Sequence, residues 1–193
     1  MALRKWLWGL GALLAVAAIG FFGFAPSIVE RSMNRIDGKP LPKVSAEAIA
    51  LHNTLTIVDL HSDTLMWKRD MLDAADRGHM DLPRLQAGNV ALQVFSSVTK
   101  TPKGQNYDAN STDTDNITLL TVAQMQPVRT WTSLLERSLW HATKLDQAVA
   151  ADKNLSKVYN AATVEGLLEK RSAKGPSQIG ALLSIEGLQN LEG

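Results

Sequence analysis

The chain contains no cysteine among its 193 residues, which excludes disulfide bonds and thiolate metal sites. A metal bound by this chain would therefore have to be held by His, Asp or Glu side chains. A strong charge of either sign is also absent, because 20 basic residues face 19 acidic residues and leave a formal net charge of +1. Without a broad positive field, we do not expect a nucleic acid as a partner.

What the chain does contain, at its N-terminus, is a long uncharged stretch. Arg4 and Lys5 precede Trp6, and no charged residue follows until after Ala25. About 20 helical residues cover the ~30 Å hydrocarbon core of a bilayer, whereas the apolar part of a cleavable signal peptide usually has ~7–15 residues. We therefore expect residues 1–25 to be a signal anchor that crosses the membrane once from Trp6 to Ala25. The basic pair would lie in the cytoplasm and the rest of the chain outside it, in the periplasm or the extracellular space.

Two other interpretations of this stretch stay open. Cleavage after Ala25 would make it a signal peptide, although Pro26 would then sit at the scissile bond. A helix buried in a protein core is the third option, although no polar face interrupts the run. Arg31 and Arg35, beyond the stretch, weaken the orientation that the N-terminal basic pair indicates.

Beyond the anchor, a linker is expected over residues 26–45 and one domain over residues 46–193. The linker would contain a short helix and then a run of turn formers. Apolar runs and helical periodicity predict strands over residues 55–58, 90–98 and 179–185, and helices over residues 45–53, 81–89, 114–151 and 163–170. This order of strand, helix, strand, long helices and strand predicts a parallel α/β architecture.

The residues that end the first and third strands are the most informative in the domain. Asp59, His61 and Asp63 occupy alternate positions, and alternate side chains of a strand share a face, so all three are expected to project the same way. An imidazole and a carboxylate two residues apart suit zinc. Glu186 ends the third strand, and in a parallel sheet it would meet His61 and Asp63 at one edge. A surface turn rich in Asp, His and Ser is the alternative interpretation of residues 59–63.

Four short motifs in this domain resemble successive landmarks of a known family. They are Asp59-Leu60-His61-Ser62-Asp63, Asp81-Leu82-Pro83-Arg84-Leu85-Gln86-Ala87-Gly88, Gln93-Val94-Phe95-Ser96 and Ser184-Ile185-Glu186-Gly187. In this order they resemble the membrane dipeptidases, also called renal dipeptidases, which are zinc hydrolases of the amidohydrolase superfamily on a (β/α)₈ barrel. The resemblance implies zinc-dependent hydrolysis of dipeptides. It also implies that this chain holds only about the first three strand-helix units of a TIM barrel, which typically needs ~250 residues.

The resemblance implies a role for each residue at the strand ends. His61 and Asp63 match the family's pair of ligands to one zinc ion, and Glu186 matches the carboxylate that bridges two zinc ions. Glu186 is therefore the expected catalytic residue as well, because the bridged ions share the hydroxide that attacks the peptide carbonyl. Asp59 is interpreted as a supporting residue. Gln189 stands where family members usually carry a histidine, which puts the substrate contacts at that position in doubt.

The resemblance implies that the remaining zinc ligands are two histidines on later strands, and we do not expect them among residues 1–193. His52, His79 and His141 are not expected to replace them, since His52 and His141 lie in helical patterns and His79 in a loop. With a half-complete site, an inactive membrane-anchored fragment that folds poorly is the main alternative to an active dipeptidase.

A metallophosphoesterase is a further alternative, because Asp59 and His61 also resemble that family's opening motif and residues 73–78 its second motif. Leu72 and Val90, however, stand where those motifs need Gly and His. The choice of dipeptide, activity on D-residues or β-lactams, and the oligomeric state, with a homodimer among the options, stay open.

Overall fold

A parallel sheet of four strands forms the centre of the molecule, whose computed structural model describes residues 2–191. The strands are β1 (Ile57–Ser62), β2 (Val90–Val98), β3 (Leu155–Lys157) and β4 (Ile179–Glu186), and they lie side by side in the order β1, β2, β4, β3. The helices are α1 (Ala2–Ile19), α2 (Ala25–Met33), α3 (Ala46–Thr54), α4 (Leu82–Ala87), α5 (Ile117–Ala123), α6 (Leu134–Ala151) and α7 (Ala161–Lys174). The predicted α/β class is confirmed, and the parallel sheet is consistent with part of a TIM barrel.

The expected number of strands was one too low. The additional strand, β3, has three residues and pairs with the first half of β4, where Leu155 lies opposite Ile179. Three residues are too few to show an alternating pattern in a sequence, and β3 follows directly on the long helix α6. Its position at the edge of the sheet comes from the pairing with β4 and not from a local signal.

The sheet is buried on both faces by separate apolar clusters. One cluster, which includes Phe95, Leu145 and Ile179, joins β2 and β4 to α6. The other, which includes Val94 and Leu167, packs α7 against the opposite face of the same strands. Successive residues of β2 thus enter different clusters, which explains why the sequence of this strand is apolar without alternation.

Residues 114–151 were expected to form one helix bent at Pro127, and this expectation was wrong in part. Helix α5 ends at Ala123, a 3₁₀ turn (η3, Val128–Trp131) follows, and α6 begins at Leu134. The buried guanidinium of Arg137 holds the break in place by donating to the carbonyl oxygens of Thr99, Thr130 and Trp131. A single helix would have used these carbonyl groups of the turn in its own ladder.

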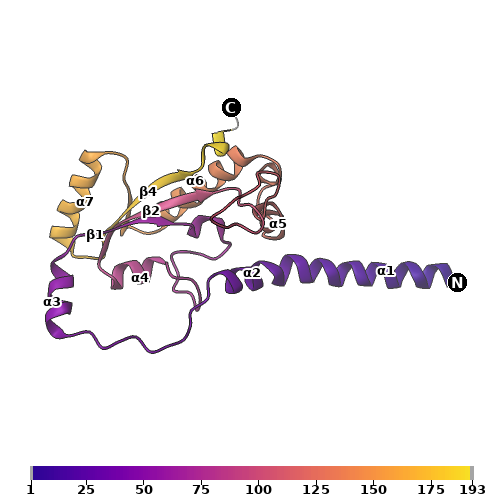
Figure 1. Ribbon diagram of the computed structural model, residues 1–193, viewed down its shortest axis with the longest axis horizontal. Coiled ribbons are helices and arrows are strands. Elements are labelled where there is room, and N and C mark those ends of the chain that lie inside the picture. The colour runs from indigo at the N-terminus through magenta and orange to yellow at the C-terminus, as the bar shows by residue number, and fades with distance from the viewer. Residues whose placement is uncertain (1, 192–193) are drawn as a thin grey trace.

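The N-terminal helix projects away from the sheet domain (Figure 1). Helices α1 and α2 join without a break through a π-helical turn, η1 (Gly20–Phe24), just before Pro26, which has no N–H group to donate. The helix from Leu3 to Met33 is long and apolar enough to cross a membrane. After α2, residues 35–45 run exposed and without regular structure to α3, on the far side of the domain (Figure 1).

Candidate metal site

A histidine and two carboxylates meet at the carboxyl edge of the sheet. The Nε2 atom of His61 lies 2.8 Å from Oδ1 of Asp63 and 3.1 Å from Oε2 of Glu186. His61 and Asp63 come from the end of β1 and Glu186 from the end of β4, with β2 between them. One ligand atom from each residue lies within 4.8 Å of the other two, and all three side chains are about half exposed. The site is therefore open to solvent and to a substrate.

Asp59 lies outside this cluster although it shares the alternating pattern. Its Oδ1 atom accepts a hydrogen bond from the backbone N–H of His61, with an N···O distance of 3.1 Å. The register between β1 and β2 also shifts between Asp59 and Ser62, so the strand is irregular where the ligand motif begins. Asp59 therefore contacts the backbone of His61 and not the imidazole ring.

Asp63 directly follows β1 and precedes a 3₁₀ turn, η2 (Thr64–Met66). Its Oδ1 atom is buried and makes no hydrogen bond within residues 2–191, although it lies 2.8 Å from the His61 ring nitrogen. A buried carboxylate oxygen without a donor is costly, whereas a metal ion satisfies it well. This oxygen and the His61 ring nitrogen beside it are two of the three atoms that could bind a cation here.

A cleft of about 420 Å³ opens beside the cluster. Asp59, His61 and Asp63 line it together with Asn34 and His79, among others. Neither Asn34 nor His79 was expected at the site from the sequence. The only signal for His79 is its position in the loop that follows the ligand motif, and Asn34 reaches the cleft from the end of α2.

The other two histidines lie away from the cluster, as expected. His141 is buried in α6, where its Nδ1 atom lies 2.9 Å from the Ser97 hydroxyl, and burial lowers the pKa of the ring to about 3. The Nε2 atom of His52, on α3, lies 3.1 Å from the carbonyl oxygen of Gly88. The side-chain amide of Gln189 turns back and donates to the carbonyl oxygen of Glu186.

A family model for the membrane dipeptidases (Peptidase family M19) matches residues 45–193. The chain belongs to the membrane dipeptidase family. The match begins at Ser45, the residue that caps α3, and contains β1 to β4 and the whole His61, Asp63 and Glu186 cluster. No curated protein and no solved structure matches the chain.

Membership of the membrane dipeptidase family implies a hydrolase that acts on dipeptides. It favours this function over the metallophosphoesterase alternative. Asp76, one of the residues on which that alternative depended, is engaged by Arg31 and Arg77 and takes no part in the cluster.

Proposed function

We propose that this membrane dipeptidase hydrolyses dipeptides with zinc held by His61, Asp63 and Glu186. The observation that carries the proposal is the convergence of one imidazole and two carboxylates from strands more than 120 residues apart in the sequence. Zinc accepts nitrogen and carboxylate oxygen ligands, and the chain has no thiolate to offer instead. Dipeptides would reach the metal through the cleft beside His61.

The spacing of the three ligand atoms is close to what zinc needs. With bonds of about 2.0–2.2 Å, two ligands of a tetrahedral zinc ion lie about 3.3–3.6 Å apart. The observed separations from His61 Nε2, 2.8 Å to Asp63 and 3.1 Å to Glu186, are shorter by a few tenths of an ångström. Because the side chains are half exposed, small rotations are enough to open the site around an ion.

Each residue then has a chemical task. Zinc bound here would supply a Lewis acid for the peptide carbonyl and a water molecule of lowered pKa. His61 and Asp63 would fix one ion, while Glu186, with a second carboxylate oxygen, can reach another. Asp59, bonded to the His61 backbone, would hold the imidazole in position as a supporting residue. Three ligands hold one ion, so a binuclear centre calls for ligands in addition to these.

The placement in the cell is part of the same proposal. Residues 1–25 would be the anchor and residues 26–45 would join it to the dipeptidase region from residue 46 onward. The catalytic region would lie outside the cytoplasm, because Arg4 and Lys5 ahead of the anchor favour a cytoplasmic N-terminus. The long apolar helix supports an anchor, and the match to the membrane dipeptidase family supports the catalytic region.

The test is zinc binding by the full chain in detergent, measured by calorimetry and by metal content. We expect His61→Ala to weaken zinc binding at least about 100-fold. Loss of a residue that only supports a metal ligand lowers metal affinity about 10- to 100-fold, and loss of the ligand nitrogen itself should cost more. Hydrolysis of an alanyl dipeptide, where the wild type shows it, should be lost as well. His52→Ala is the matched control, since His52 lies on α3 and outside the cluster. Unchanged zinc affinity in the His61 variant would contradict the proposal.

A further inference from the structure

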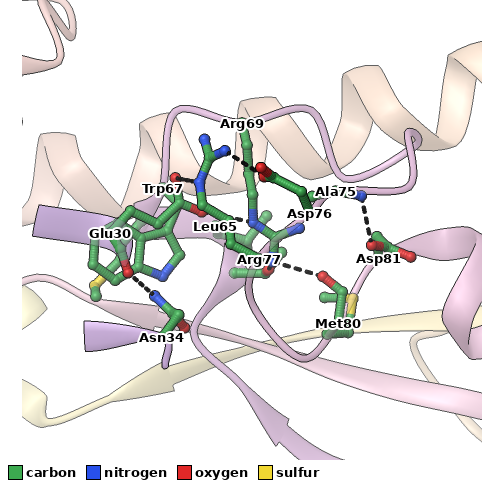
Figure 2. Close-up of polar contacts among 12 residues, drawn as sticks. Glu30, Asn34, Leu65, Trp67, Arg69, Ala75, Asp76, Arg77, Met80 and Asp81 are labelled. Atoms are coloured by element: carbon green, nitrogen blue, oxygen red, sulfur yellow. Dashed lines mark hydrogen bonds and ion pairs between the residues drawn. The ribbon is translucent and has the colours of Figure 1, made fainter. Parts of the chain in front are cut away.

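Glu30, on the helix that follows the membrane stretch, is buried against the catalytic region. Its side chain is 3% exposed, and its two carboxylate oxygens face two different arginines. Oε1 lies 2.8 Å from Nε of Arg69, and Oε2 lies 3.0 Å from Nε of Arg77. Figure 2 shows Glu30 and both arginines, with dashed lines marking further polar contacts. Because a buried carboxylate is unfavourable without such partners, this contact specifies where α2 must lie.

Two further contacts hold α2 in the same place. Arg31, the next residue, forms an exposed ion pair of 2.7 Å with Asp76. Val29 packs against the apolar cluster that includes Met66 and Trp67, on and just after the turn η2. Helix α2 therefore contacts the segment that follows the ligand motif through charged and apolar side chains together.

The segment that α2 contacts is the loop of residues 64–81, which follows directly on Asp63. Arg69 ties this loop together, because its Nη2 atom donates to the Thr64 hydroxyl at 2.9 Å and to the Met80 carbonyl oxygen at 2.6 Å. A Cβ atom at Gly78, where φ is +75°, would lie 2.9 Å from the same Nη2 atom. The loop is thus built around the Arg69 guanidinium, and Glu30 holds that guanidinium from the side of α2.

The end of α2 also reaches the cleft. Both the backbone and side-chain amides of Asn34 donate to the carbonyl oxygen of Glu30, at 2.8 Å and 3.1 Å. Asn34 lines the same cleft as His61 and Asp63. An uncharged stretch of about 20 residues is long enough to cover the bilayer core, which would place Glu30 and Asn34 just beyond it, at the membrane surface.

We propose that Glu30 is a positioning residue, through which the membrane helix holds the loop of residues 64–81 and the Asp63 end of the metal site in place. The role of Asp63 in this proposal rests on the proposed function. The contact of α2 with the loop does not. Membrane attachment and the geometry of the site are then parts of one structure, and a change at Glu30 acts on the site through Arg69.

The experiment is amide hydrogen exchange on the full chain in lipid nanodiscs, with zinc affinity measured on the same samples. In Glu30→Gln the loop of residues 64–81 should exchange at least about tenfold faster, while β2 and β4 exchange as in the wild type. Zinc affinity should fall several-fold. Glu30→Asp, which keeps the charge but is one methylene too short to meet both arginines, should give an intermediate result. Glu169→Gln, at an exposed position of α7, is the matched control and should change neither quantity.

Wild-type exchange in the loop of the Glu30→Gln protein would overturn the proposal. Equal acceleration in the loop and in β2 and β4 would overturn it too, because that pattern shows a general loss of stability. If neither protein binds zinc, the proposed function fails, and the exchange of the loop still decides the role of Glu30.

Discussion

His141 shows how one buried side chain sets a pH dependence. Desolvation in α6, together with the nearby charges of Lys144 and Arg137, lowers its pKa from 6.5 to about 3. The unfolded chain takes up a proton near pH 6.5 and the folded chain only near pH 3, so the unfolded state binds more protons between these values. His141 therefore costs no stability well above pH 6.5. Below that pH, its protonation in the unfolded chain lowers the free energy of unfolding by about 1.4 kcal/mol for each pH unit.

We expect this group to reduce the free energy of unfolding by about 2 kcal/mol between pH 6.5 and pH 5, measured by urea denaturation in detergent. His141→Gln should be less stable than the wild type at pH 7, because the contact with the Ser97 hydroxyl changes. Its stability should nevertheless depend less steeply on pH. Parallel pH profiles for the two proteins would show that His141 does not carry the effect.

Local spacing predicted which residues meet at the sheet edge but not how each is held. His61, Asp63 and Glu186 could be named because strand ends and alternate positions follow from the sequence alone. Asp59 lines the same cleft as His61 and Asp63 but lies outside the cluster, because its carboxylate accepts from the backbone N–H of His61 where the register of β1 shifts. The burial of His141 was not predictable either, since the hydroxyl that accompanies it belongs to Ser97, 44 residues away.

The short helix α4 is stabilised by its N-cap residue, Asp81. Asp81 is fully buried, and its Oδ1 atom accepts from the backbone N–H of Arg84 at 3.0 Å. Its Oδ2 atom accepts from the Ala75 N–H at 3.1 Å and pairs with the Arg84 guanidinium. One carboxylate therefore caps the helix, neutralises a cation and ties the end of the loop of residues 64–81.

Asp81→Ala should lower the free energy of unfolding by about 2–4 kcal/mol, because it leaves two backbone donors without their acceptor and removes the partner of the partly exposed Arg84 guanidinium. Ser45→Ala removes the cap of the exposed helix α3, where Ser45 accepts from Ala48, and should cost only about 1 kcal/mol. Urea denaturation of both variants makes the comparison. Equal losses would mean that the burial of Asp81 adds nothing to its capping role.

Elements with local start and stop signals could be predicted, and elements fixed by distant partners could not. The caps Ser45 and Asp81 mark α3 and α4 in the sequence, and the apolar run of β2 was predicted with its observed ends. The break between α5 and α6 depends on Arg137 reaching the carbonyl oxygen of Thr99, 38 residues earlier. No periodicity in the sequence carries that information.

At the scale of the whole molecule, the sequence predicts which side of the membrane the domain after the N-terminal helix occupies. An alkaline phosphatase fused after Gly193 should be active, since Arg4 and Lys5 favour a cytoplasmic N-terminus. A β-galactosidase fused at the same point, which works only in the cytoplasm, is the matched control and should be inactive. The reverse pair of activities would place the catalytic region in the cytoplasm.

The parallel order of strands, and so the meeting of their ends, was predictable for the whole molecule from alternating helices and strands. The position of α2 against the sheet domain was not predictable. The turn formers after residue 36 indicate only a linker. The residues near Glu30 carry no signal that its carboxylate will contact Arg69 and Arg77, some 40 residues later. Long-range ion pairs of this kind follow from the tertiary structure alone.

The exposed segment of residues 35–45 has a consequence for how this protein would leave a membrane. It is the covalent path from α2 to the rest of the chain, and its exposed backbone suits a protease. Cleavage in this segment would not release the catalytic region, because α2 would still bind it through Glu30, Val29 and Arg31. Salt screens buried ion pairs weakly, so shedding of the nicked protein would need a denaturant that loosens α2, and proteolysis alone would leave it on the bilayer.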